Sequence, residues 1–389
     1  MRNFSCDVLI AGGGVAGISA ALAAARNGAD VILLEKQCVL GGLATSGLIT
    51  IYLPLCDGRG TQLSFGSAEE LFLLSILHGA QDKYPEPWLR EASREERSTL
   101  RFEVQFNPVW FSLETEELLL REHVRILYDY RLCGACCENG HLKSVTALSE
   151  TGMQEITFRT AVDATGSAVL CRLCGEKTLP HANGNSAAGW YYGSHAGGLK
   201  LHMLGFADIV PGSERDGQVA QGPRFTGDTG EDVNAFLYQS HAMTLSALRK
   251  VSGESNDFLE PALMTSMPQL RMIRRLDGEH VMTEAEDGRP CETSIGMVGD
   301  WRKRGPRFEV PYEILYSRVD NLYAAGRIVS CDDGMWDILR VIPCCAVTGE
   351  AAGTAAALEC SGAGRPSAAQ VQERLRLQGQ KLHFTDLEA

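Results

Sequence analysis

The chain has 389 residues, of which 44% are hydrophobic and 22% are charged, so it is long enough to bury a substantial core and to form two domains. Its formal net charge of −13 would repel a phosphate backbone, which argues against a nucleic-acid partner. Glycines interrupt the apolar stretch from Val8 to Ala25, so we expect no membrane span, no signal peptide and a cytoplasmic protein with reduced thiols.

The N-terminal segment predicts a strand, a glycine turn and a helix. The strand and turn occupy Asp7 to Gly17, and an Ala-rich helix continues through Ile18 to Arg26. A second short strand, Val31 to Leu34, leads into Glu35, which stands twenty-one positions after Gly14. This order and spacing are typical of a dinucleotide-binding fingerprint, and the alternative is a glycine-rich turn.

The residue types of this turn suit a diphosphate. Gly12 allows the tight turn, Gly14 lacks a Cβ so that a pyrophosphate can approach, and Gly17 lets the helix pack closely on the sheet. The first amides of the helix lie at its positive end and form a phosphate site. These amides belong to Val15, Ala16 and Gly17. The carboxylate of Glu35 can accept hydrogen bonds from ribose hydroxyls.

A loop of small residues follows the second strand. Its members would let the backbone pass close to a flat ligand, and the alternative is a flexible turn. They are Gly41, Gly42, Leu43, Ala44 and Thr45. Cys38 stands alone in this region, without the second cysteine that a redox pair would need. A helix is predicted over Ala68 to Gly79.

An antiparallel ribbon is predicted in the middle of the chain, at about residues 124–166. Alternating segments are separated by the turn pairs Asn139-Gly140 and Thr151-Gly152. The expected elements are a helix at Phe111–His123, strands at Val124–Tyr128, Leu142–Leu148 and Gln154–Phe158, and a buried strand that ends at Thr160–Gly166.

The remaining sequence predicts a substrate domain and a return to the nucleotide domain. Helices are predicted over Asp232–Val251 and Asp257–Leu263. Asp320–Arg327 reads as a strand that leads to glycine, and Ala346–Leu358 reads as an Ala/Gly-rich helix. We therefore expect domains at residues 1–178, 179–311 and 312–389.

Thirteen cysteines are present, and an odd count excludes complete disulfide pairing. The spacings Cys133-x-x-Cys136-Cys137 and Cys171-x-x-Cys174 are compatible with a metal or iron–sulfur site. Cysteine is also a common small core residue, and we expect no bound metal.

Six segments together resemble the two-dinucleotide-binding-domain flavoproteins, and more narrowly the bacterial FAD-dependent oxidoreductases related to fumarate reductase flavoproteins. In chain order they are Asp7–Gly17 with Glu35-Lys36, Gly41–Gly47, Asp163–Gly166, Gln269–Arg275, Asp320–Arg327 and Arg340–Gly353. The resemblance implies an α/β fold with a Rossmann-like FAD-binding domain, which has a parallel sheet and an antiparallel β-ribbon. A substrate, or cap, domain would be inserted into this discontinuous chain.

The resemblance also implies FAD and assigns residues to its parts. Gly12, Gly14 and Gly17 would lie on the pyrophosphate, with Glu35 and Lys36 at the adenosine ribose. Gly41, Gly42, Leu43, Ala44 and Thr45 would pass near the ribityl chain and flavin. Ala164, Thr165 and Gly166 would lie on the adenine side, and Gly326 and Arg327 near the ribityl phosphate. The helix that contains Cys345 and Gly349 would point its positive end at the pyrimidine edge of the flavin.

The expected chemistry is a dehydrogenase or reductase reaction that transfers hydride between a small organic substrate and flavin, with an external electron carrier. Arg340 is the first candidate to hold a substrate carboxylate, and Arg271 is the next. Asp333 and Tyr312 are candidate proton handlers; Asp333 lies where related proteins often carry a histidine. The alternatives are a core salt bridge for Arg340, a solvated face for Arg271 and structural roles for the other two.

Two other flavoenzyme classes are disfavoured. A disulfide reductase would need a second nucleotide fingerprint, and an aromatic hydroxylase would show Gly-Asp where this chain has Gly326-Arg327. A flavin-dependent RNA-modifying protein and a thiazole-synthase-like protein that consumes NAD are the alternative functions. A homo-oligomer is compatible with all of them.

Overall fold

The computed structural model describes residues 4–195, 198–210, 212–220, 222–254, 260–362 and 364–387. The chain forms two compact units. Unit 1 comprises Met1–Gly42, Thr50–Leu179 and Arg275–Ala389, and unit 2 comprises Leu43–Ile49 and Pro180–Arg274. The chain therefore leaves unit 1 twice, once for a short loop and once for a long insertion.

These limits differ from the predicted domain boundaries in two places. Leu43–Ile49 belongs to unit 2 rather than to the first predicted domain. Residues 275–311 belong to unit 1 rather than to the predicted substrate domain. The physical reason is a hairpin in this segment, whose first strand packs on two C-terminal helices. The elements are β18 (Ser294–Gly299), β19 (Arg307–Pro311), α8 (Ile342–Ser361) and α9 (Ala368–Leu377).

A five-stranded parallel sheet forms the centre of unit 1, with strand order β20-β10-β2-β3-β6. Four of its strands are fully buried, as expected where helices cover a parallel sheet. The register places Ala11, Leu34, Asp163 and Ala324 side by side, so the carboxyl ends of four strands meet at one edge. The strands are β2 (Val8–Ala11), β3 (Val31–Glu35), β6 (Arg125–Tyr128), β10 (Thr160–Asp163) and β20 (Leu322–Ala324).

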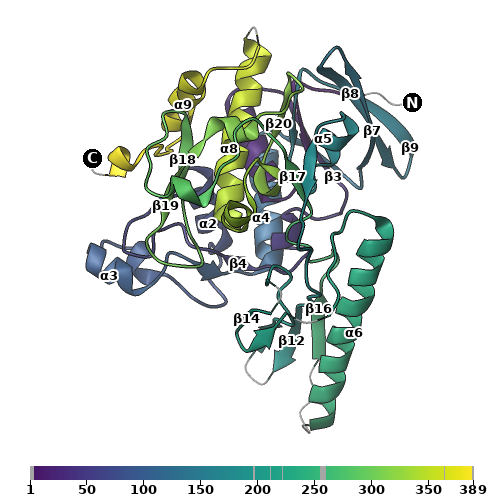
Figure 1. The fold of residues 1–389 in the computed structure, drawn as a ribbon, viewed down its shortest axis with the longest axis vertical. Helices are drawn as coiled ribbons and strands as arrows, with labels where there is room; N and C mark the ends of the chain where they lie inside the picture. Colours follow the sequence, from purple (N-terminus) through teal and green to yellow (C-terminus); the bar gives the residue numbers. More distant parts are fainter. Residues whose placement is uncertain are drawn as a thin grey trace. The chain divides into compact units, whose positions relative to one another are not determined.

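The predicted antiparallel ribbon is present in a second sheet of unit 1, with order β1-β9-β8-β7, in which β1 pairs parallel with β9 (Figure 1). It spans residues 131–157 and not 124–166, because β6 and β10 pair with strands of the parallel sheet. Asn139 and Gly140 have φ of +51° and +78°, the two positive values that a tight type I′ hairpin turn requires. The expected α/β fold class is therefore confirmed. The strands are β1 (Phe4–Ser5), β7 (Arg131–Glu138), β8 (His141–Ser149) and β9 (Gly152–Thr157).

Helices α1 and α8 pack against each other along small residues and cover the parallel sheet. The other elements of unit 1 are short. The helices are α1 (Val15–Arg26), α2 (Ser67–Ser75), α3 (Arg94–Thr99), α4 (Pro108–Arg121), α5 (Val169–Leu173) and α7 (Asp333–Leu339). The 3₁₀ turns are η2 (Glu86–Trp88), η3 (Glu284–Glu286), η4 (Tyr312–Leu315), η5 (Gly326–Ile328) and η6 (Phe384–Leu387). The remaining strand pair is β4 (Ile51–Tyr52) with β5 (Val104–Gln105).

Unit 2 contains an antiparallel sheet of order β13-β12-β16 and the long helix α6 (Gly230–Glu254), which Figure 1 shows clearly. Two small apolar clusters form its core, one around Trp190 and one around Phe236. Its strands are β12 (Tyr191–His195), β13 (Gly198–His202), β14 (Glu214–Arg215), β15 (Gln218–Val219) and β16 (Glu260–Met264). The chain changes unit within β11 (Thr178–Pro180), within β17 (Arg274–Leu276) and at η1 (Gly42–Ala44).

The helix predicted over Asp257–Leu263 is wrong where the structure describes it. Glu260–Met264 is strand β16, which pairs with β12, and Asp257 and its neighbours up to residue 259 lie outside the described residues. Pairing with the free edge of β12 overrides the weak helical pattern of this short segment. The helix predicted over Asp232–Val251 is confirmed as the longer α6.

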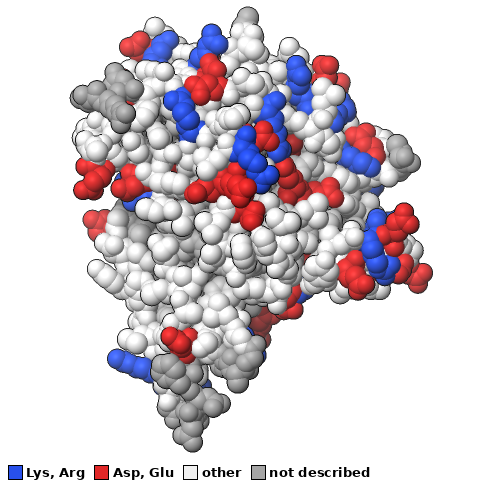
Figure 2. Space-filling model, turned by 180° about the vertical axis from the view of Figure 1, so that it is seen from behind, with Lys and Arg blue, Asp and Glu red and all other residues white. Residues whose placement is uncertain are grey.

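Charged side chains of both signs are intermixed on the face drawn in Figure 2. Among the described residues, no single helix has the length and hydropathy that a membrane crossing needs, although α7 and α8 taken together across their 88° bend meet both criteria.

Candidate cofactor site

Three glycines of the first turn have different structural roles. Gly12 has φ of +105°, and a Cβ there would lie 2.6 Å from the carbonyl oxygen of Ala164. A Cβ at Gly17 would lie 1.8 Å from the oxygen of Gly12, so only glycine allows α1 to approach the turn. A Cβ at Gly14 would have no heavy atom within 4 Å. The side of Gly14 is therefore open, as a site for a pyrophosphate requires.

Helix α1 begins directly after this open position. Gly14 is its N-cap residue and supplies no side-chain hydrogen bond to the first turn. The amides of Val15, Ala16 and Gly17 thus keep the arrangement that binds an anion at the positive end of a helix. These observations fit the predicted diphosphate site.

Glu35 braces the glycine turn from the end of β3. Its Oε2 accepts a hydrogen bond from the amide of Gly13 at 2.7 Å, and its Oε1 accepts one from the amide of Gln37 at 2.9 Å. Burial raises the pKa of Glu35, and the two amides act in the opposite direction. Each oxygen retains a second lone pair for a ribose hydroxyl. The sequence did not indicate the hydrogen bond between Glu35 and the amide of Gly13. Lys36, which follows Glu35, is exposed.

The loop after β3 lies directly against the glycine turn. The amide of Gly41 donates to the oxygen of Gly13 at 2.8 Å, and a Cβ on Gly42 would lie 3.2 Å from the Cα of Gly14. Leu43, Ala44 and Thr45 belong to unit 2, where the Leu43 and Thr45 carbonyls accept hydrogen bonds from Ile49 and Leu48. The predicted contacts of these three residues with the cofactor stay predictions.

The Ala164–Gly166 segment is organised by Asp163, a buried carboxylate to which the sequence pattern assigned no role. Asp163 Oδ1 accepts hydrogen bonds from the amide and hydroxyl of Thr165, at 3.0 and 2.7 Å. Its Oδ2 accepts one from the amide of Cys171 at 2.9 Å. The available signal was an acidic residue at the end of an otherwise apolar strand. Asp163 thus shapes the loop predicted to face the adenine.

Gly326 and Arg327 approach the same region from the end of β20. A Cβ on Gly326 would lie 2.7 Å from the Cβ of Ala16, and its amide donates to Thr348 Oγ1 at 3.0 Å. The Arg327 guanidinium packs where a Cβ on Gly166 would lie, 2.4 Å from its Nη2. Burial lowers the pKa of Arg327 to about 10, so it stays charged at neutral pH.

Cys345 lies in the first turn of α8, which begins without a side-chain cap. Its Sγ donates to the carbonyl oxygen of Arg340 at 3.4 Å and would lie 3.5 Å from a Cβ on Gly326. Burial raises the pKa of Cys345 to about 11, although nearby Arg327 and Arg340 oppose the shift. The positive ends of α1 and α8 and the cation of Arg327 therefore lie in one region of unit 1.

Gly349 lies at the packing interface of α8 with α1. A Cβ on Gly349 would lie 2.3 Å from the carbonyl oxygen of Ala16. The same is true one turn further on, where a Cβ on Gly353 would lie 2.0 Å from the oxygen of Ala20. The structure thus gives Gly349 a helix-packing role.

The two charged catalytic candidates of unit 1 both hold ion pairs around α7. Arg340 Nε donates to Asp337 Oδ1 at 3.0 Å, and Asp333 Oδ1 lies 2.8 Å from Nη1 of the buried Arg275. Asp337 and Arg275 were not predicted, because their role depends on contacts and not on a motif. Arg340 matches the core salt bridge considered as the alternative.

The other two candidates are buried. Tyr312 is fully buried against Tyr316, with ring centroids 4.8 Å apart, and burial raises its pKa. Arg271 lies in unit 2, where its guanidinium carbon is 4.9 Å from the centroid of the Trp190 ring. Arg271 is therefore a core cation of unit 2, and the solvated face considered for it is wrong.

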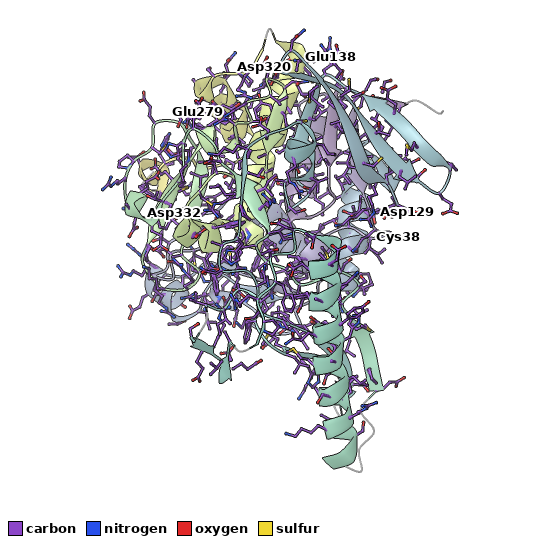
Figure 3. The ribbon with its side chains drawn as sticks, turned by 45° about the vertical axis from the view of Figure 1, so that its right-hand side comes forward. Cys38, Asp129, Glu138, Glu279, Asp320 and Asp332 are labelled. Atoms are coloured by element: carbon purple, nitrogen blue, oxygen red, sulfur yellow. The ribbon has the colours of Figure 1, made fainter. Side chains whose placement is uncertain are left out.

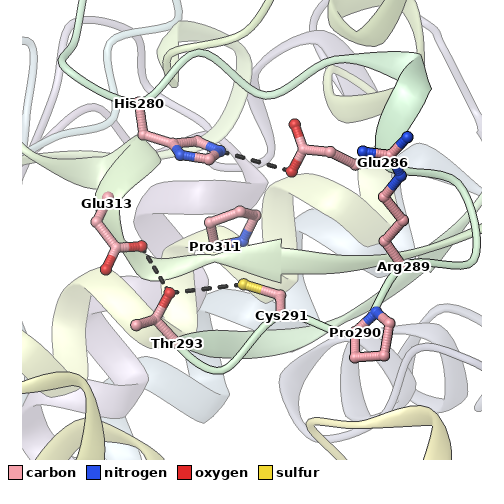
Figure 4. A pocket seen from close by; sticks show the side chains of 8 residues that line it. All are labelled: His280, Glu286, Arg289, Pro290, Cys291, Thr293, Pro311 and Glu313. Carbon is pink, nitrogen blue, oxygen red and sulfur yellow. Dashed lines mark hydrogen bonds and ion pairs between the residues drawn. The ribbon is translucent and has the colours of Figure 1, made fainter.

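A cavity of about 380 Å³ lies elsewhere in unit 1 (Figure 4). Thr293 Oγ1 donates to Glu313 Oε2 at 2.7 Å, and His280 Nε2 lies 3.5 Å from Glu286 Oε2. These four residues line the cavity, together with Arg289, Pro290, Cys291 and Pro311. None of these is a predicted site residue.

The cysteines show no metal-binding arrangement in the described part of the chain. No group of three or more His, Cys, Asp or Glu side chains among the described residues is placed to hold an ion. All thirteen cysteines are free thiols. Cys38 is exposed on the loop after β3, near Asp129, and both are labelled in Figure 3.

The comparisons with known proteins agree with a flavin site. The family described as FAD dependent oxidoreductase matches residues 7–191 and 231–378. A thioredoxin reductase of Ureaplasma parvum is 35% identical over 79 residues, which are 20% of this chain and only 26% of that protein.

Two solved structures are similar to this chain at low sequence identity. A geranylgeranyl bacteriochlorophyll reductase-like protein from Thermoplasma acidophilum is 12% identical, with a TM-score of 0.49 over 97% of this chain and 83% of that one. An anhydrotetracycline hydroxylase from Streptomyces rimosus is also 12% identical, with a TM-score of 0.45 over 96% of this chain and 65% of that one. Because the family match spans most of the chain and the glycine turn fits a dinucleotide, the chain belongs to the FAD-dependent oxidoreductase family and is an enzyme that binds FAD.

Proposed function

We propose that this enzyme is a dehydrogenase or reductase that transfers hydride between a small organic substrate and FAD. An external electron carrier would complete the catalytic cycle. The enzyme would act in the cytoplasm and would have neither a nucleic acid nor a membrane as a partner. The observation that carries the proposal is the open side of Gly14 beneath the uncapped start of α1.

Different residues of unit 1 would hold different parts of FAD. The amides of Val15–Gly17 would bind the pyrophosphate, Glu35 the ribose, and the Ala164–Gly166 loop the adenine side. Arg327 would lie near the ribityl phosphate, and the first turn of α8, at Cys345, would lie at the flavin end and stabilise negative charge there. FAD supplies hydride acceptance and donation, and the protein positions the substrate and handles the proton.

Arg340 remains the proposed contact for a substrate carboxylate. Its Nε and Nη2 both donate to Asp337 Oδ1, at 3.0 and 2.5 Å, and this ion pair fixes the orientation of the guanidinium. Asp333 is paired with Arg275 and half exposed, so it is a better proton handler than the fully buried Tyr312. Arg271 stays the second candidate for this contact.

Disulfide reduction is the less favoured activity, despite the thioredoxin reductase relative. Cys38 is exposed and has no cysteine partner in its own loop, and no second nucleotide fingerprint follows a strand elsewhere in the sequence. Gly326-Arg327 also departs from the Gly-Asp of aromatic hydroxylases.

The test is the absorption spectrum of the purified protein, followed by anaerobic mixing with hydroxy acids, sugars and enoates. We expect a yellow protein whose flavin band bleaches with an oxidisable substrate, or recovers with an enoate after chemical reduction. A yellow protein that reacts only when NADPH and oxygen are present together would contradict a dehydrogenase or reductase. A colourless protein that refuses added FAD would contradict the site itself.

A further inference from the structure

Trp336 is a fully buried side chain of α7 that contacts two other segments of unit 1. Its indole Nε1 donates a hydrogen bond to the carbonyl oxygen of Arg327 at 2.7 Å. The guanidinium carbon of Arg275 lies 4.4 Å from the centroid of its ring. One side chain therefore joins α7 both to η5, which contains Arg327, and to β17, which contains Arg275.

The buried cation of Arg275 holds the start of α7 at two further points. Its Nε donates to the carbonyl oxygen of Cys331 at 2.6 Å, and its Nη1 lies 2.8 Å from Asp333 Oδ1. The N-cap of α7 is a different carboxylate, Asp332, which Figure 3 labels and whose Oδ1 accepts a hydrogen bond from the amide of Met335 at 2.7 Å. Arg275 thus ties the first turn of α7 to β17 and fixes the plane of the tryptophan ring that it covers.

The peptide between Gly326 and Arg327 is anchored from two helices. The amide of Gly326 donates to Thr348 Oγ1 in α8 at 3.0 Å, and the carbonyl of Arg327 accepts the hydrogen bond from Trp336 in α7. A Cβ on Gly326 would lie 2.7 Å from the Cβ of Ala16, so this peptide lies against the first turn of α1. A change in its position would therefore reach the amides that are placed to bind the pyrophosphate.

We propose that Trp336 is a positioning residue for the cofactor, which acts through the carbonyl of Arg327 and is itself held in place by Arg275. The indole N–H sets the position of η5 relative to α7, and the stacked guanidinium sets the direction of the N–H. The inference rests on the proposed function, because it requires FAD at the start of α1.

The experiment titrates full-length, FAD-free protein with FAD and follows the visible absorption and circular dichroism of the flavin. W336F keeps an aromatic ring beneath Arg275 but removes the N–H. We expect it to bind FAD about fivefold more weakly, the usual effect of losing one buried hydrogen bond, and to change the circular dichroism of the bound flavin.

A second variant tests the link to Arg275. R275K keeps the positive charge but loses the planar group that stacks on the ring, so it should weaken FAD binding in the same direction. Because both changes act through one hydrogen bond, the double variant should lose less affinity than the two single losses combined. Full additivity would overturn the role of Arg275.

Trp88 provides a matched control in unit 1. Its Nε1 donates to the carbonyl oxygen of Leu100 at 2.9 Å, and the guanidinium carbon of Arg97 lies 5.5 Å from the centroid of its ring. These partners belong to α3 and its C-cap. W88F should lower the melting temperature of the FAD-free protein about as much as W336F does, and should keep the wild-type affinity for FAD.

Two outcomes would overturn the proposal: W336F that binds FAD as tightly as the wild type, or W88F that loses as much affinity as W336F. A cooperative melting transition of each FAD-free variant establishes that it folds. If the wild-type protein itself does not bind FAD, the proposed function fails instead, so the two failures are distinguishable.

Discussion

Gly14 combines an unstrained backbone with an open side. Its φ of −71° and ψ of 178° are accessible to any L-residue, and nothing in the protein occupies the position of a Cβ. Its neighbours differ, because Gly12 and Gly17 are required by the fold itself. Gly14 is thus a position where loss of the cofactor can be separated from loss of folding.

We expect Gly14→Val to fold and to bind FAD about 100-fold more weakly, because the branched side chain would occupy the path of the pyrophosphate at a cost of about 3 kcal/mol. Flavin content after gel filtration and a titration of the apoprotein with FAD measure this. The control is Gly230→Val, an equally open glycine at the start of α6, which should keep its FAD. A Gly14→Val protein that stays fully loaded would refute the assigned pyrophosphate path.

Glu350 is a buried carboxylate in the middle of α8 that no motif indicated. Its Oε2 accepts hydrogen bonds from the amide of Ser67 at 2.9 Å and from Gln380 Nε2 at 2.7 Å. It thereby caps α2, whose N-cap residue Gly66 has no side chain. Burial raises the pKa of Glu350 to about 7, from 4.5, although these hydrogen bonds oppose the shift.

This pKa predicts a pH dependence of stability. The folded state binds the proton more tightly than the unfolded state, so the contribution of Glu350 is complete below pH 4.5 and is lost as the pH rises towards 7. Its slope is at most about 1.4 kcal/mol per pH unit. Glu350→Gln mimics the protonated form, so we expect it to unfold with the wild type at pH 4.5 and later than the wild type at pH 8. Urea unfolding at both pH values measures this, and a constant difference between the proteins would contradict it.

At the scale of elements, the contact between α1 and α8 depends on small residues. Gly349 and Gly353 face the carbonyl oxygens of Ala16 and Ala20, so the two backbones approach more closely than any side chain would allow. This packing holds the start of α8, with Cys345, beside the start of α1. The small residues at this contact therefore account both for the close packing of α1 on α8 and for the proximity of the two positive helix ends.

Gly353→Ala should lower the free energy of unfolding by about 3 kcal/mol or more, because its Cβ would lie 2.0 Å from a backbone oxygen. Chemical denaturation measures the loss. Gly134→Ala is the matched control, since a Cβ there meets Thr146 at an ordinary 3.4 Å and should change stability by less than about 0.5 kcal/mol. Equal stability of the two variants would contradict the packing role of Gly353.

In short elements, pairing with a neighbouring strand can override the local sequence pattern. Glu260–Met264 forms strand β16 because β12 offers it an edge, whereas the long amphipathic α6 follows its sequence pattern. A segment of five residues has too few local interactions to resist its surroundings, and a helix of twenty-five residues does not.

At the scale of the whole molecule, the excess of acidic over basic residues favours a small-molecule substrate over a nucleic-acid partner. With a net charge of −13 and intermixed surface charges on the face in Figure 2, we expect no saturable retention of tRNA in a filter-binding assay at low salt. Low salt is the most permissive condition, so it gives the sharpest test. Saturable binding that weakens as salt is added would support the RNA-modifying alternative instead.

The pattern of residues along the chain is sufficient to predict the nucleotide turn and the α/β class. Gly12, Gly14, Gly17 and Glu35 act within one strand–turn–helix–strand segment, where spacing along the chain is also spacing in space. The hairpin at Asn139-Gly140 was predictable for the same reason.

Features that depend on contacts between distant segments follow from the folded chain alone. The fold engages Arg340 with Asp337, places Gly349 in a helix interface and buries Glu350 beneath α2. It also moved residues 275–311 into unit 1. Burial and ion pairing arise when the chain closes on itself, and a linear pattern of residue types does not carry that information.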